Sequence, residues 1–180
     1  RLDRLAGSHT YGRAISEGVV TAIVGKPNTG KSSLYNALAG EELAIVTDEA
    51  GTTRDVLSSE LSVGNVLLRL SDTAGLHDTA DPIEQMGVDR ARRALEEAEL
   101  VLFLSDGTDP AADEALYREL TATAEHACIL SVRTKCDLGN GAHMAIPANA
   151  LPVSSLTGEG MDALEAAVRD AFIDGGLETA

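Results

Sequence analysis

The stretch Val19–Gly40 reads VVTAIVGKPNTGKSSLYNALAG and decides the fold. An apolar run typical of a strand comes first, a turn with the pattern GxxxxGK[ST] follows from Gly25 to Ser32, and the next residues have helical spacing that ends at a glycine. Glycines let a backbone turn its N–H groups toward an anion, and the start of the following helix adds the positive end of its dipole. Strand, loop and helix in this order predict a phosphate-binding loop.

The chemistry of this loop assigns a role to each polar residue. Lys31 is expected to hold the outer phosphates during catalysis, and the Ser32 hydroxyl to ligate Mg²⁺. The remaining nucleotide contacts are expected from Asn28, Thr29, Gly30 and Ser33.

Strand-like and helical segments alternate along the rest of the chain, which predicts an α/β domain with a mostly parallel sheet. Besides Val19–Val24, strands are expected at Val66–Asp72, Leu100–Asp106, His126–Val132 and Ala150–Ser155. The alternating segment Asp55–Val63 meets Val66 through the turn Gly64-Asn65, which predicts one antiparallel edge strand. Helices are expected at Lys31–Ala39, Met86–Ala98, Asp113–Ala124 and Met161–Phe172.

Polar loops follow these strands, and in a parallel sheet such loops meet at one edge. DTAG begins at Asp72, which can hold Mg²⁺ through water, while the Gly75 N–H can sense a terminal phosphate; the alternative is a simple strand-ending turn. TKCD covers Thr134, Lys135 and Asp137, whose carboxylate can accept two hydrogen bonds from guanine and none of that kind from adenine. SSLTG offers a backbone N–H to the guanine carbonyl from Ser154, Ser155 or Leu156.

Composition narrows the possible functions of the 180 residues. With 14 Lys and Arg against 29 Asp and Glu, the net charge of −15 disfavours direct binding of nucleic acid by this domain. The two cysteines, Cys128 and Cys136, and the scattered histidines have no metal-ligand spacing, so no zinc is expected. The chain has no run of about 20 apolar residues and no signal peptide, which makes the cytoplasm the expected location.

Five loops together, GKPNTGKS, GTTRD, DTAG, TKCD and SSLTG, resemble those of the translation-factor-related GTPases. Two longer blocks, beginning at Lys26 and at Asp72, resemble more narrowly the G domain of the MnmE (TrmE) family of tRNA-modification GTPases. The resemblance implies a P-loop GTPase (Ras-like) fold with a six-stranded, mostly parallel sheet, helices on both faces and one antiparallel edge strand. It also implies GTP or GDP as the bound nucleotide. Thr134 departs from the usual asparagine; it either alters nucleotide affinity or substitutes for asparagine without loss.

The same resemblance implies ions and a catalytic residue. A K⁺ ion would be held by Asn28 with Thr47, Glu49 and Thr52, and Thr53 matches a magnesium ligand. Ras-like enzymes orient the attacking water with a glutamine after DTAG, where this chain has Leu76. The family is thought to use a glutamate that corresponds to Glu84, with Asp81 as the rival and a solvated helix-start acid as the alternative.

The expected organisation is a G domain at 18–173 between a linker from a preceding helical domain at 1–17 and a second linker at 174–180. In the MnmE family, such a domain hydrolyses GTP under K⁺ stimulation and dimerises in the transition state. The full protein, with an FAD-dependent partner, modifies the wobble uridine of tRNA. Two alternatives stay open: the G domain of an Era- or Der-like ribosome-assembly GTPase, and a GTP-dependent interaction module that does not hydrolyse GTP.

Overall fold

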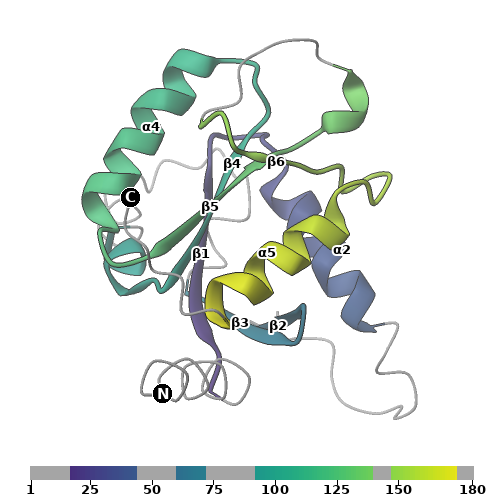
Figure 1. Ribbon diagram of the computed structural model, residues 1–180. Coiled ribbons are helices and arrows are strands. Elements are labelled where there is room, and N and C mark those ends of the chain that lie inside the picture. The colour runs from purple at the N-terminus through teal and green to yellow at the C-terminus, as the bar shows by residue number, and fades with distance from the viewer. Residues whose placement is uncertain (1–16, 44–59, 72–91, 140–146, 174–180) are drawn as a thin grey trace.

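The computed structural model describes residues 17–43, 60–71, 92–139 and 147–173, which form one six-stranded sheet with helices on both faces (Figure 1). The strands are β1 (Val19–Gly25), β2 (Glu60–Val63), β3 (Val66–Leu70), β4 (Leu100–Ser105), β5 (Cys128–Arg133) and β6 (Leu151–Pro152). The helices are α2 (Lys31–Leu43), α4 (Pro110–Thr123), the short 3-10 helix η2 (Cys136–Leu138) and α5 (Met161–Ile173), and residues 92–97 are also helical.

The strand order is β2-β3-β1-β4-β5-β6, and every neighbouring pair is parallel except β2 with β3. This confirms the predicted fold class and its antiparallel edge. The hairpin closes where expected, since Val63 pairs with Val66 and both Gly64 and Asn65 have positive φ, as a tight two-residue turn requires. The carboxyl ends of the parallel strands point to the same edge of the sheet, at the top in Figure 1.

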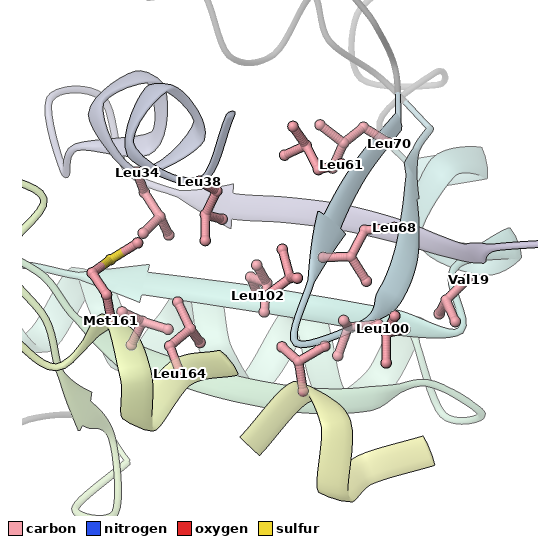
Figure 2. Close-up of a cluster of buried hydrophobic side chains, with 14 of the residues drawn as sticks. Val19, Leu34, Leu38, Leu61, Leu68, Leu70, Leu100, Leu102, Met161 and Leu164 are labelled. Carbon is pink, nitrogen blue, oxygen red and sulfur yellow. The ribbon is translucent and has the colours of Figure 1, made fainter. Parts of the chain in front are cut away.

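Alternation along the central strands divides the core into two clusters. On one face Leu100, Leu102 and Leu104 of β4 pack with α2 and α5, for example with Leu34 and Leu164 (Figure 2). On the other face Val101 and Phe103 pack with α4, where the Phe103 ring lies 5.2 Å from that of Tyr117. Burial on both faces explains the almost continuous apolar sequence of these strands.

Element ends differ from the sequence predictions in several places. Helix α2 does not stop at Gly40 as expected but continues to Leu43, and β6 ends at Pro152 because the chain turns at Ser154. Helix α4 begins three residues before the predicted Asp113: the Asp109 side chain accepts from the Ala112 N–H at 3.1 Å and Pro110 occupies the first turn. In the described part of the chain no helix is long and apolar enough to span a bilayer.

Candidate nucleotide site

The loop between Gly25 and Lys31 joins the end of β1 to the start of α2, as the sequence predicted. Gly25 has no room for a side chain, since a Cβ atom would lie 2.8 Å from the Leu104 carbonyl oxygen on the next strand. Gly30 has a different reason to be glycine: its φ is +95°, although a Cβ atom there would meet Thr134 only at an ordinary contact distance of 3.8 Å. Asn28 also has a positive φ, 63°, a conformation that asparagine tolerates better than most residues. The loop therefore has a sharply defined backbone path.

Side-chain donors bind the carbonyl oxygens of this loop. The Lys31 ammonium donates to the Gly25 oxygen at 3.1 Å and to the Lys26 oxygen at 2.8 Å. The Thr29 hydroxyl also donates to the Lys26 oxygen, at 2.8 Å. Thr29 and Lys31 are 1% and 6% exposed, and the bonds that they make to the loop are partly buried. With its carbonyl oxygens engaged in this way, the loop is suited to present N–H groups to an anion.

Two residues of the predicted base-reading segment, Thr134 and Lys135, also hydrogen-bond to this loop. The Thr134 hydroxyl donates to the Thr29 oxygen at 2.5 Å, and the Lys135 ammonium donates to the Asn28 oxygen at 2.6 Å. Thr134 is buried, and its hydroxyl also lies 3.3 Å from the Ser105 oxygen. Thr134 thus connects the phosphate loop to the end of β4, a task for which a short hydroxyl side chain suffices.

An ion pair with Asp106 fixes Lys135, which has a left-handed backbone with φ of 57°. The Lys135 ammonium lies 2.9 Å from Asp106 Oδ2, and Thr108 donates to Oδ1 from both its N–H and its hydroxyl. Burial alone would raise the pKa of Asp106, but the hydrogen bonds from Thr108 and Lys135 outweigh it and lower that pKa to about 2. Asp106 therefore carries its charge at neutral pH and holds Lys135 against the loop.

The two predicted base-binding segments lie side by side, because the Cys136 N–H donates to the Val153 oxygen at 3.3 Å. Asp137 sits in η2 and is exposed. Two large apolar side chains are exposed nearby in sequence, Leu138 at 61% and Leu156 at 87%. Ser154 is buried instead and organises its turn, since its hydroxyl accepts from the Thr157 N–H at 3.2 Å. This arrangement offers an exposed carboxylate and apolar surface to a planar base.

Most predicted nucleotide residues are therefore gathered at one edge of the sheet: Asn28, Thr29, Gly30, Lys31, Ser32, Ser33, Thr134, Lys135, Asp137, Ser154, Ser155 and Leu156. Other predicted residues lie outside the described ones, namely Thr47, Glu49, Thr52, Thr53, Asp72, Gly75, Asp81 and Glu84. The sequence places SDGT, which contains Asp106, among the polar loops at this edge, but sequence reasoning gave Asp106 no role, although an acid directly after an apolar strand and before Gly107 is a recognisable signal.

Sequence reasoning also missed a second ion pair, between Lys26 of the loop and Asp113 of α4, whose Nζ and Oδ1 atoms lie 2.9 Å apart. A cavity of about 570 Å³ adjoins the loop at Gly25 and Lys31 and extends between β1 and α4. Its described lining includes none of the predicted base-reading residues. The cavity is therefore separate from the surface that carries Asp137.

Comparison of the sequence with known proteins also points to a GTPase. The model of the 50S ribosome-binding GTPase family matches residues 20–135. Among curated relatives, the tRNA modification GTPase MnmE of Rhodospirillum rubrum is 47% identical over 96% of this chain, and that of Levilactobacillus brevis is 41% identical over 99%. The chain spans 39% of the length of each of these two relatives.

Solved structures support the fold alone. The G domain of the T. maritima FeoB iron transporter superposes with a TM-score of 0.58 at 23% identity, covering 82% of this chain and 94% of that one. A variant of SsGBP gives a TM-score of 0.52 at 20% identity, covering 84% of this chain and 56% of that one.

The predicted resemblance to the G domain of MnmE is thus confirmed. By its family match, its fold and its loops, the chain belongs to the 50S ribosome-binding GTPase family and is a GTPase domain.

Proposed function

We propose that this GTPase domain is the GTP-hydrolysing switch of an MnmE-like enzyme that modifies the wobble uridine of tRNA in the cytoplasm. The support is the level of identity, about 40% or more over nearly the whole chain, to several relatives named as tRNA modification GTPases. The modification chemistry, an FAD-dependent partner and tRNA itself belong to the whole enzyme in this proposal. The strongly acidic G domain does not bind the RNA directly in this proposal.

The observation that carries the nucleotide assignment is the pair of anchored segments at the sheet edge. Side chains hold the carbonyl oxygens of Lys26, Asn28 and Thr29, which suits the loop to bind phosphates through N–H groups. Asp137 stands exposed beside it, and a carboxylate can accept from both the ring N–H and the amino group of guanine. GTP and GDP are therefore the proposed ligands.

Two ions fit this site in part. Ser32 is the second residue of α2, directly after Lys31, and can supply a hydroxyl to Mg²⁺, with Thr53 and Asp72 as the further proposed ligands. Asn28, in the loop itself, is the proposed side-chain ligand of K⁺, together with Thr47, Glu49 and Thr52. When bound, the two cations would neutralise negative charge on the phosphates.

Glu84 is the proposed residue that orients the attacking water, because Leu76 cannot hydrogen-bond to it. Glu84→Ala should lower the hydrolysis rate about a hundredfold, or about 2.7 kcal/mol, and leave GTP affinity nearly intact. Single-turnover hydrolysis and equilibrium binding measure the two effects separately. Full activity in this variant, with loss of activity in Asp81→Ala, would transfer the role to Asp81.

Potassium and dimerisation form the finer part of the proposal. GTP hydrolysis should be faster in K⁺ than in Na⁺, and light scattering should show a dimer only with GDP, aluminium fluoride and K⁺. Asn28→Gly is the most direct variant, because glycine accepts the φ of 63° at this position while the side-chain oxygen is lost. Hydrolysis and dimerisation that are indifferent to the ion would contradict this part and leave Asn28 as a turn residue.

The family match also favours a second candidate, a ribosome-assembly GTPase of the Era or Der kind, because the family is described by binding to the 50S subunit. Cosedimentation of the full-length protein with 50S subunits, together with normal wobble-uridine modification in a strain that lacks it, would favour this candidate. A GTP-dependent interaction module without hydrolysis would instead show no product in a single-turnover assay.

A further inference from the structure

Lys26 carries a positive charge inside the proposed phosphate-binding loop, yet its side chain is turned toward α4. Its ammonium lies 2.9 Å from Asp113 Oδ1 and donates to the Asp109 oxygen at 3.0 Å. The Asp113 side chain is 2% exposed and that of Lys26 is 20% exposed. The contact with Asp113 is an ion pair, and among the described residues Asp113 Oδ1 accepts no hydrogen bond.

Burial separates this pair from the surface pairs of the described residues. Arg92 pairs with Glu96 in the helical residues 92–97, and Arg118 pairs with Glu114 in α4. Both pairs are exposed and join neighbours within their own helix, a type of pair that contributes little to stability. The Lys26–Asp113 pair instead joins two segments that lie far apart in sequence. Removing one partner of such a pair leaves a buried charge unpaired, which is strongly unfavourable.

The backbone of Lys26 explains why its side-chain anchor matters for ligand binding. Its carbonyl oxygen accepts from the Lys31 ammonium, the Thr29 hydroxyl and the Thr29 N–H, at 2.8, 2.8 and 3.3 Å. The direction of this one carbonyl therefore sets the positions of Lys31 and Thr29. Pro27 follows and restricts the backbone of Lys26 further.

We propose that Lys26 and Asp113 are positioning residues of the nucleotide site, whose buried ion pair fastens the phosphate loop to the first turn of α4 and so keeps Lys31 in place. Lys26 is not a phosphate ligand in this proposal, since its charge is directed to Asp113. The proposal rests on the proposed nucleotide site.

The test compares GDP dissociation with stability, using a fluorescent GDP analogue and thermal melting without nucleotide. Lys26→Met and Asp113→Asn should each release GDP about tenfold faster. Lys26→Arg, which keeps the charge, should stay within about twofold of the wild type, as should Glu114→Gln, which breaks only the exposed pair on the same helix. Rates are compared at a temperature at which all variants are folded.

Leu120→Ala separates positioning from stability, because Leu120 of α4 is buried in a core cluster that contains no residue of the loop from Lys26 to Lys31. This variant should lower the melting temperature and leave GDP dissociation within about twofold. A replacement of both partners, Lys26→Met with Asp113→Leu, should restore the melting temperature lost in the single variants. GDP should still dissociate from it faster than from the wild type.

Three results would overturn the proposal: normal dissociation in Lys26→Met and Asp113→Asn, normal dissociation in the double variant, or dissociation that simply follows melting temperature in all variants including Leu120→Ala. If neither single variant folds while Leu120→Ala does, the pair is a folding requirement and the positioning role is likewise rejected. Absence of GDP binding by the wild type would contradict the proposed function itself, a different outcome from any of these.

Discussion

The phosphate loop and the base-reading segments share one edge of the sheet but are built in opposite ways. Loop residues Thr29 and Lys31 are buried, and donors from Lys31, Thr134 and Lys135 occupy the carbonyl oxygens around them. In the base-reading segments Asp137, Leu138 and Leu156 are exposed. In the proposed nucleotide site the phosphate end is thus formed without a ligand, whereas the base end offers exposed surface that a ligand can cover.

The physical demands of the two halves of a nucleotide explain this difference. Phosphate oxygens bind well only to N–H groups that already point toward them, because reorienting dipoles during binding is unfavourable. A base instead gains from covering apolar surface and from a few hydrogen bonds at its edge. The comparison therefore predicts large effects when the loop is changed and smaller ones when the apolar base surface is changed.

Loss of Lys31 should have the largest effect. In the proposed site Lys31→Ala removes charge-assisted hydrogen bonds to phosphates, each worth about 1.5–3 kcal/mol, so GDP and GTP affinity should fall roughly a thousandfold. It also frees the Gly25 and Lys26 oxygens. Isothermal titration measures the change, and Asn36→Ala, at an exposed position of α2 outside the proposed site, is the matched control with a small expected effect. Comparable losses in both variants would contradict a loop organised around Lys31.

The ion pair of Asp106 with Lys135, which connects the two regions, should make the stability of the protein depend on pH. The pKa of Asp106 is about 2 in the fold against an ordinary 3.8, so its charge contributes about 2 kcal/mol of stability above pH 4. Because the folded pKa is the lower one, this contribution is lost as the pH falls from about 4 to 2. Urea unfolding of the wild type and of Asp106→Asn should therefore differ at pH 5 and converge near pH 2. A stability gap that does not change with pH would count against the ion pair with Lys135.

Truncation of the apolar base surface should have the smallest effect. Leu156 is 87% exposed, so Leu156→Ala should leave the melting temperature without nucleotide unchanged. GDP affinity should fall about fivefold, or about 1 kcal/mol, if the base covers this side chain. Melting curves with and without GDP measure both quantities. A lower melting temperature without nucleotide would show that Leu156 packs within the protein instead.

The sequence predicted well what depends on local pattern. The order of strand, loop and helix around Gly25–Ser32, the antiparallel turn at Gly64-Asn65 and the common edge for TKCD and SSLTG all follow from neighbouring residues. The start of α4 was also readable, because Asp109 and Pro110 form a helix cap, but the cap was overlooked. The end of α2 was misjudged because a glycine on an exposed helix face is tolerated within a helix.

What the sequence did not predict depends on contacts between distant residues. Two ion pairs have no local pattern. The pair of Lys26 with Asp113 joins the phosphate loop to α4, and the pair of Lys135 with Asp106 joins the residues after β5 to the residue that follows β4. Thr134 is the instructive case: by sequence it is a departure from asparagine in a base-reading motif. In the fold its hydroxyl is directed to the Thr29 oxygen of the phosphate loop. That contact joins residues far apart in the chain, so no local pattern indicates it.

The most direct test of the account is the base preference of Asp137→Asn, measured by competition of GDP and XDP for the same site. The wild type should bind GDP more tightly, because two carboxylate oxygens match the two donors of guanine. The asparagine offers one acceptor and one donor, which matches xanthine, so the variant should prefer XDP. An undiminished preference for GDP in Asp137→Asn would contradict the central claim that this exposed carboxylate reads the base beside a preformed phosphate loop.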